Sequence, residues 1–487
     1  MTRINTNVSS IIAQNNLART NADLSTRLER LATGLQINRG ADNPAGLIVS
    51  ERLRTEIAGI GQSIDNIERA SNVIATTEGA LAEINKLLVD IKGLAVEAAN
   101  TGAFSQEEIE ANQLQIDSAI ESITRIANTT SFAGLKLLNG SLDYIISGQP
   151  ASAVTDIKVL GANFGTADSV PVTLEVLNSA EKASLFIDGG TGAGAGTFLS
   201  SVSFEIRGVR GVEAFSFVSG TALSAVAAAI NTRTDATGIT ALLANSTNAA
   251  SGLVLESNEY GSDQFVSVRK LEDGDFFQTF DQQGGSPIIR DTGEDVLSLV
   301  NGNLALGDGL DVSLKSSTLN IDLTLTSGTA TTTGVEQSFT ITGGGATYQI
   351  GGEVNSQQQV GFGIQSVAAT NLGNARQGFL NSVVSGGDNS LVASRQREAS
   401  EIIDLAIDQI SSLRGRLGAF ERNTLETTLR SQQIALENLT ASESVIRDTD
   451  FAEETAALSR AQILQQAGTS TLAIANSSAQ SVLSLLG

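Results

Sequence analysis

Two residue types that carry much of enzyme chemistry are absent from this 487-residue chain. Without cysteine it can form no disulfide, thiolate nucleophile or zinc–sulfur site. Without histidine it lacks the commonest general base and the commonest transition-metal ligand. There is no tryptophan and there are three tyrosines, which disfavours an aromatic ligand pocket. We therefore expect a protein that is not an enzyme and that has no metal or cofactor site.

Long apolar runs and an excess of basic residues are also missing. The sequence has no run of about 18–20 apolar residues that could span a bilayer. Residues 1–20 lack the continuous apolar segment of a secretory signal. Lys plus Arg is 30 against 53 for Asp plus Glu, which gives a formal charge of −23. Because nucleic acids and anionic membranes bind basic faces, we expect neither as a partner and no membrane insertion.

Each end of the chain carries a heptad-like stripe of apolar residues. The spacings are seven, four, three and four near the N-terminus, and three, four, three and four near the C-terminus. Such a stripe is too narrow for the flank of a globule and needs a partner helix. We expect the partners to be the other end of the chain and neighbouring copies, which indicates assembly. The stripes are Leu17, Leu24, Leu28, Leu31 and Leu35, and Leu472, Ala475, Ala479, Val482 and Leu486.

Breaks divide these helical ends into segments. Gly34 interrupts the first helix, Asp42 is a good N-cap, and Pro44 suits the first turn of a new helix. That second helix keeps its three-four rhythm over about 80 Å at the usual helical rise, longer than a compact domain needs. The expected helices cover 8–35, 44–100, 105–128 and 394 onward, with a joint at 449–451.

The middle of the chain differs from the ends in composition and in hydrophobic pattern. From about 141 to 390, short alternating segments between glycine-rich turns predict strands, with one helical island at 222–232. The helical ends can lie antiparallel only if the chain leaves and returns at the same place. We therefore predict an α+β fold: a long antiparallel coiled-coil helical hairpin built from both chain ends, with a β-rich inserted region of one or two domains.

Both ends resemble bacterial flagellin. The segments 31–38 (LATGLQIN) and 42–47 (DNPAGL) are similar to the family's signature between its first two helices. The segment 459–470 (SRAQILQQAGTS) is similar to the C-terminal signature almost letter for letter, and 482–486 (VLSLL) fits as well. The similarity covers about 1–140 and 394–487. In the middle, the segment from Val202 to Val268 resembles the hook-IN motif of some flagellins.

The resemblance implies a structural subunit that self-assembles into the bacterial flagellar filament for swimming motility. Its parts would be terminal coiled-coil segments in the inner filament core (1–43 plus 450–487), a helical rod with a small β part (44–175 plus 394–449), and a variable, surface-exposed insert (176–393). The assembly interface would comprise Leu17, Leu24, Leu28, Leu31, Leu35, Ile463, Leu464, Leu472, Val482 and Leu486. The inter-domain joints would be Gly34, Asp42, Pro44, Gly46 and Asp450.

The resemblance also implies partners and a location. These are copies of the chain itself, hook-associated and cap proteins, an export chaperone and the flagellar export apparatus. The protein would be secreted to the extracellular flagellum without a cleaved signal peptide. Members of the family are often detected by an innate immune receptor. The receptor-facing pattern carries Arg where this chain has Asp90, and its Glu and Arg align with Gln115 and Ala119. We therefore expect weak receptor binding.

Three alternatives differ from a filament subunit. A hook–filament junction (hook-associated) protein has similar terminal helices, although the C-terminal signature favours flagellin. A metallopeptidase in the insert needs histidine ligands, which this chain lacks. An adhesive role of the insert stays open. Because 469–487 is rich in modest helix formers, we further expect both extreme ends to order only on assembly.

Overall fold

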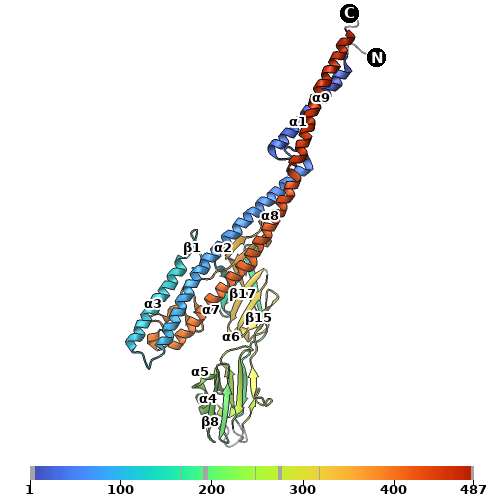
Figure 1. Cartoon of the computed structure of the whole chain (residues 1–487). Helices are drawn as coiled ribbons and strands as arrows, with labels where there is room; N and C mark the ends of the chain where they lie inside the picture. The colour runs from blue at the N-terminus through green and yellow to red at the C-terminus, as the bar shows by residue number, and fades with distance from the viewer. Residues whose placement is uncertain are drawn as a thin grey trace. The chain divides into compact units, whose positions relative to one another are not determined.

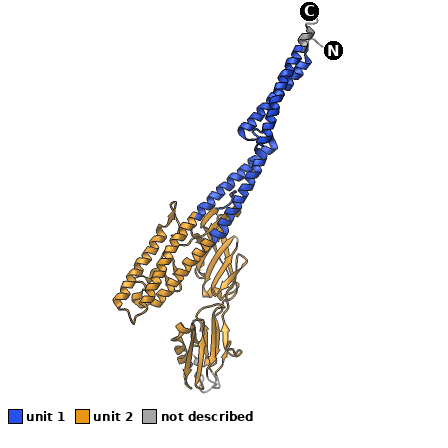
Figure 2. Cartoon of the chain, viewed as in Figure 1, with its two compact units in different colours: residues 1–71, 349–354, 419–487 blue, residues 72–348, 355–418 orange. Residues whose placement is uncertain are grey.

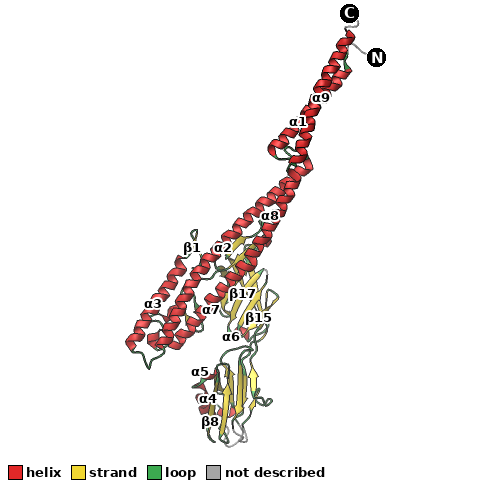
Figure 3. Cartoon of the chain, in the orientation of Figure 1, coloured by secondary structure: helices red, strands yellow, loops and turns green. Residues whose placement is uncertain are grey.

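The computed structural model describes residues 6–165, 167–189, 196–246, 248–271, 277–316 and 318–483. The chain divides into two compact units (Figure 2). Unit 1 comprises residues 1–71, 349–354 and 419–487, and unit 2 comprises residues 72–348 and 355–418. The division falls within the second helix and near the end of the seventh (Figure 1). Helices dominate unit 1, whereas unit 2 also contains the sheets (Figure 3).

The helices begin and end where the local sequence dictates. The first helix stops at Thr33 because Gly34 adopts a left-handed φ of 74° and its N–H bonds the carbonyl of Arg30. Ser105 and Glu108 form a capping box at the start of the third helix. The main helices are α1 (Val8–Thr33), α2 (Pro44–Ala98), α3 (Gln106–Thr129), α7 (Gln396–Phe420), α8 (Glu426–Arg447) and α9 (Phe451–Leu483), and the short ones are α4 (Leu223–Asn231), α5 (Thr234–Thr237) and α6 (Ser327–Ala330).

One feature differs from the predicted regular rhythm. A π-helical turn, η5 (Glu421–Leu425), joins α7 to α8. Leu417 and Leu425 are both fully buried although they lie eight positions apart, whereas two α-helical turns span about 7.2 residues. The wider turn absorbs the extra residue and returns Leu425 to the buried side of its helix.

Unit 2 contains an eight-stranded antiparallel sheet in the order β3-β18-β5-β14-β15-β16-β17-β4. One face of this sheet covers a core of aliphatic side chains that includes Val172, Ile321 and Ile341. Its strands are β3 (Tyr144–Ser147), β4 (Val154–Ala162), β5 (Val170–Asn178), β14 (Leu297–Val300), β15 (Asn303–Asp308), β16 (Asp311–Lys315), β17 (Leu319–Leu325) and β18 (Glu336–Gly344).

Two four-stranded sheets enclose a second core, rich in phenylalanine, against which α4 packs. Phe204 stacks on Phe277 with ring centroids 4.8 Å apart. The first sheet has the order β12-β6-β10-β9 and the second the order β13-β11-β7-β8. Their strands are β6 (Ser184–Ile187), β7 (Val202–Arg207), β8 (Val212–Phe217), β9 (Ile239–Leu243), β10 (Leu253–Ser257), β11 (Phe265–Lys270), β12 (Thr279–Phe280) and β13 (Arg290–Thr292).

The remaining described elements are short strands and 3₁₀ turns, most of them in unit 2. The two-stranded pairs are β1 (Ser131–Phe132) with β2 (Leu135–Lys136), β19 (Ala346–Gln349) with β20 (Gln359–Phe362), and β21 (Gly373–Asn374) with β22 (Gly378–Phe379). The 3₁₀ turns are η1 (Ala249–Ser251), η2 (Ser356–Gln358), η3 (Leu380–Val383) and η4 (Leu391–Ala393). The predicted fold class is confirmed, and the helical island at 222–232 corresponds to α4.

Candidate assembly surface

The first and last helices of the chain pair along their lengths in unit 1. Figure 1 shows α1 and α9 side by side. The Asn7 side-chain amide donates to the carbonyl of Ala475 (2.9 Å), and Gln465 donates to Asn21 (2.9 Å). Because low numbers on α1 meet high numbers on α9, the two helices are antiparallel.

Small side chains let the two helices approach closely. Ser10 and Ala13 are buried on α1, and Ala461 is buried on α9. A Cβ atom added at Gly468 would lie 3.2 Å from Cδ1 of Leu17. The contact between α1 and α9 therefore buries few large apolar groups and leaves most of them for other surfaces.

Large apolar side chains point away from this pair into solvent. Ile463 is 68% exposed, Leu464 is 52% exposed and Leu28 is 50% exposed. Burying exposed apolar side chains of this kind against another protein surface is favourable, which makes them candidates for an assembly contact. We call this set the terminal apolar surface; it comprises Val8, Ile11, Ile12 and Leu28 of α1 and Phe451, Ile463, Leu464 and Ile474 of α9.

The sequence-predicted interface residues divide into three groups. Leu28, Ile463 and Leu464 belong to the terminal apolar surface. The side chain of Val482 and the whole of Leu486 lie outside the described residues. The remaining members are half-buried: Leu17, Leu24, Leu31, Leu35 and Leu472. Further exposed apolar side chains lie on α2 and α8 of the same unit, namely Ile48, Val49, Ile434 and Val445.

The two predicted joints bond to each other through their backbones. Leu35 forms an antiparallel bridge with Asp448. The N–H of Gln36 donates to the carbonyl of Arg447 (2.7 Å), and the N–H of Thr449 donates to the carbonyl of Gly34 (2.9 Å). The two breaks in the helices, before α2 and before α9, are thus joined by backbone hydrogen bonds.

Side chains in the loop before α2 hold that loop in place. The carboxylate of Asp42 accepts from the backbone N–H groups of Arg39 (2.8 Å) and Asn38 (3.0 Å). These bonds hold the pKa of Asp42 below its usual value. Asn43 accepts from the N–H of Gly46 (2.9 Å), and a Cβ atom at Gly46 would lie 2.8 Å from the Asn43 amide nitrogen. Pro44 begins α2 with its fixed φ.

Asp450 caps α9 on the other side of the joint, since its carboxylate accepts from the N–H groups of Ala452 (2.8 Å) and Glu453 (3.1 Å). Beyond it, Glu454 is buried and receives Nη1 of Arg27 on both carboxylate oxygens, at 3.1 and 3.2 Å. Sequence reasoning missed this ion pair. The sequence signal that could have indicated the pair is a residue of opposite charge on each terminal helix, at positions where the two helices face each other.

The positions that the resemblance aligns with a receptor-facing pattern lie on α2 and α3 of unit 2. Asp90 and Gln115 are exposed, and Ala119 is half-buried. These positions are accessible to a protein partner, and their effect on receptor binding stays a prediction.

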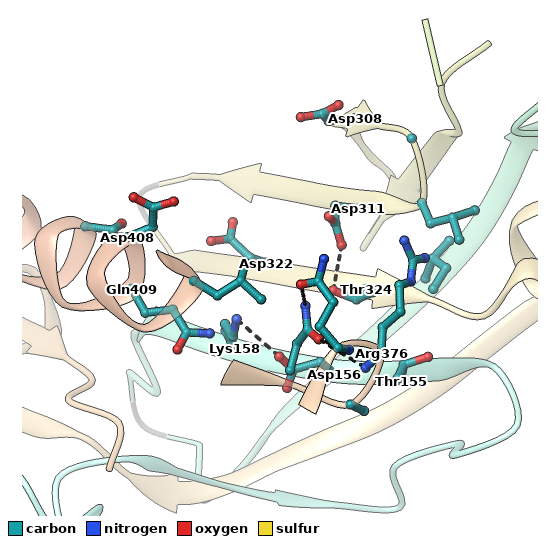
Figure 4. Close-up of a pocket in the computed structure, with 18 of the residues that line it drawn as sticks. Thr155, Asp156, Lys158, Asp308, Asp311, Asp322, Thr324, Arg376, Asp408 and Gln409 are labelled. Atoms are coloured by element: carbon teal, nitrogen blue, oxygen red, sulfur yellow. Dashed lines mark hydrogen bonds and ion pairs between the residues drawn. The ribbon is translucent and has the colours of Figure 1, made fainter. Parts of the chain in front are cut away.

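Unit 2 contains a groove of about 1170 Å³ beside β4, β16 and β17 (Figure 4). Two ion pairs lie along it: Lys158 contacts Asp156 at 3.2 Å, and Arg376 pairs with Glu259. Within the described residues, no group of three or more His, Cys, Asp or Glu side chains is arranged to hold a metal ion. None of the helices in the described part of the chain combines the length and apolar content that a membrane crossing needs.

Family models match three regions of the chain. The bacterial flagellin N-terminal helical region matches residues 4–143, and the C-terminal helical region matches residues 400–486. The flagellin hook IN motif matches residues 203–259, within the predicted 202–268.

Curated proteins match over the whole chain. A B-type flagellin of Pseudomonas aeruginosa is 30% identical, and a flagellin of Salmonella typhimurium and flagellin B of Helicobacter pylori are each 29% identical. Each match covers 99% of this chain and 99% of the relative. Among solved structures, a flagellar hook associated protein-3 of Legionella pneumophila is 12% identical, with a TM-score of 0.30 over 80% of this chain and 97% of that one.

Proposed function

This chain belongs to the bacterial flagellin family, and we propose that it assembles into the flagellar filament through its terminal apolar surface. Flagellins are structural subunits of an extracellular filament used for motility, and self-assembly is their function. The observation that carries the proposal is the exposure of Ile463, Leu464 and the other large apolar side chains on α1 and α9. Burying one such side chain against another copy contributes about 1.5–3 kcal/mol.

Substitutions at the surface test this mechanism without disturbing the fold. Ile463→Ser and Leu464→Ser alter side chains that are exposed in the single chain, so we expect the monomer's stability to change by less than about 0.5 kcal/mol. The same substitutions should abolish or strongly slow polymerisation, measured by sedimentation and electron microscopy. Leu306→Ser is the matched control, because Leu306 is 76% exposed on β15 of unit 2 and is not part of the terminal apolar surface. Normal filaments from the double variant would refute the proposal.

The interface extends, in this proposal, to the half-buried leucines and to Val482 and Leu486. Residues 1–43 plus 450–487 form the inner filament core, 44–175 plus 394–449 the rod, and 176–393 the exposed insert. Gly34, Asp42, Pro44, Gly46 and Asp450 act as the joints between the core and the rod. The backbone bonds between Gly34 and Thr449 support this role, because they hold the two joints together.

We also propose that the extreme ends order fully only in the filament. The contact between α1 and α9 supports this, because it fully buries no large apolar side chain that would offset the conformational entropy of ordering two long helices. Deleting 459–487 should leave a soluble, folded unit 2 that does not polymerise. Excising 182–293 is the control, because Glu181 and Glu294 are bridged and a short linker can join them. That variant should still form filaments, whereas filaments from the 459–487 deletion would contradict the assignment.

The same experiments distinguish the hook–filament junction alternative. A junction protein forms a short zone, so the purified chain would not extend into long filaments by itself. We expect long homopolymers.

Our remaining proposals concern partners and the absence of catalysis. The chain contacts hook-associated and cap proteins at the ends of the filament. It leaves the cell through a chaperone and the flagellar export apparatus without a cleaved signal peptide. It performs no catalysis. It binds the innate receptor weakly because Asp90 would place a carboxylate opposite the partner's carboxylates. Full-strength signalling by purified monomer in a receptor reporter assay would refute the last point.

A further inference from the structure

One sheet face of unit 2 is basic, although the chain as a whole carries a formal charge of −23. The face belongs to the sheet β13-β11-β7-β8. Its other face is buried: Phe204, Ile206 and Val266 are fully inaccessible in the phenylalanine-rich core. Because side chains alternate along a strand, their neighbours in sequence point outward.

The strand register places the outward cations in adjacent rows. Arg207 on β7 lies opposite Ser267 on β11, and Ser267 lies opposite Arg290 on β13. Neighbouring strands are about 4.8 Å apart, so Arg207 and Arg290 flank the serine about 10 Å from each other. In the next row, Arg269 lies opposite Glu205. We call these three arginines and Glu205 the basic face.

The basic face is only partly neutralised within the described chain. Glu205 pairs with Arg269 at 2.8 Å, yet the Arg269 side chain stays 68% exposed. Arg290 lies over the ring of Phe265 at 4.2 Å, which fixes its position while its N–H groups remain available. Arg207 is exposed, and no ion pair to it is formed among the residues that the structure describes. The rows thus carry more positive than negative charge.

Other surfaces of the same unit are acidic. Asp308 is exposed, and its pKa is raised by partial burial and by the nearby carboxylates of Asp295, Asp263 and Asp311. A carboxylate that lies among other carboxylates, as Asp308 does, is stabilised in its charged form by an external cation. In a homopolymer each basic face lies among acidic copies at high effective concentration.

We propose that the basic face docks on a carboxylate-rich surface of a neighbouring copy of this chain. The inference rests on the proposed filament and adds a second, ionic contact between inserts to the apolar contact between terminal helices. Two different patches meet in such a contact, so it repeats from copy to copy and continues in an open polymer.

Zero-length cross-linking tests the contact directly. Arg207→Lys and Arg290→Lys keep the charge and supply amines that a carbodiimide joins to nearby carboxylates. Filaments grown from an equal mixture of ¹⁴N- and ¹⁵N-labelled chains separate links between copies from links within one. We expect mixed-isotope links at the two introduced lysines to exceed those at Lys315, an exposed native lysine on β16. Same-isotope links alone, or no links, would overturn the proposal.

Polymerisation should respond to the same cations. With Arg207→Gln, Arg269→Gln and Arg290→Gln combined, we expect filaments whose critical concentration rises about tenfold at low salt and matches the parent near 1 M salt. A charge-matched control replaces exposed cations elsewhere, Arg125, Arg233 and Lys315, with Gln and should change less. Equal effects in the two variants would overturn the proposal. The proposal would also be overturned if heparin binding depended on the three arginines while the filaments gave no mixed-isotope links. Failure of the parent to form filaments would instead refute the proposed function.

Discussion

Replacing Arg27 with alanine should weaken assembly more than removing its buried partner. The Glu454 side chain is 7% exposed, and its two oxygens bond Nη1 of Arg27. Arg27 is 28% exposed and also pairs with Asp23 at 3.2 Å. Arg27→Ala therefore leaves a buried carboxylate without its cation, whereas Glu454→Ala leaves an arginine that is solvated and still paired.

The partial exposure of Arg27 sets the size of the effect. Breaking a fully buried pair costs about 3–5 kcal/mol. Water can enter where the arginine was, so we expect about 1–3 kcal/mol for Arg27→Ala, and below about 1 kcal/mol for Glu454→Ala. If α1 and α9 must pair in the filament, the critical concentration rises about 5- to 150-fold for Arg27→Ala. Combining Arg27→Ala with Glu454→Ala should give the smaller effect of Glu454→Ala.

Seeded polymerisation of the full chain, followed by sedimentation of filaments, measures these concentrations. Arg19→Ala is the control, because Arg19 is exposed on α1. The reasoning fails if Glu454→Ala is as harmful as Arg27→Ala, or if the double substitution is as harmful as Arg27→Ala alone.

Three further outcomes follow from local geometry. Deleting exposed Asn423 should turn the π-helical turn into α-helix and change the melting temperature by only a few degrees. Deleting exposed Ser411 instead shifts the buried residues that follow it out of register, so it should lower the melting temperature strongly. Gly46→Ala, whose Cβ would lie 2.8 Å from side-chain atoms of Asn43 and of buried Ile37, should melt at a lower temperature than Gly61→Ala, whose Cβ meets open space. Equal melting temperatures of the two variants would contradict the predicted crowding at Gly46. Hydrogen bonds lower the pKa of Asp42 in the folded state, so its carboxylate stabilises the fold above the unfolded pKa near 3.9, and this stabilisation is lost as pH falls through the folded pKa. Carboxyl NMR titration should find the lower folded pKa, and Asp42→Asn should remove this part of the pH dependence of stability.

Local signals in the sequence predicted the helix boundaries well. Gly34, Pro44 and Ser105 each impose a backbone conformation on their nearest neighbours, so their effects can be deduced without knowing the fold. The alternating segments and glycine-rich turns likewise indicated strands. The hook-IN region was recognised from its motif, and a family model matches within it.

Contacts distant in sequence could not be deduced in this way. The bond between Arg27 and Glu454 joins residues 427 positions apart, and the bridge from Leu35 to Asp448 is too short to leave a pattern. The heptads also failed to show which side of α1 would face α9. Leu28 belongs to the predicted stripe yet is half exposed, because small residues such as Ala13 make the close contact. The π-helical turn could not be predicted, because the spacing of eight between Leu417 and Leu425 is also expected of an α-helix with two successive spacings of four.

The adjacent ends of α1 and α9 restrict how the protein can be labelled. A fluorescent protein or affinity tag joined before Val8 or after Leu483 would lie beside the terminal apolar surface and compete for the space that other copies occupy. The turn at Gly284 in unit 2 offers a better insertion point. It is exposed, its glycine has a φ of 74°, and no atom lies within 4 Å of an added Cβ. Imaging probes and displayed peptides therefore belong at that turn.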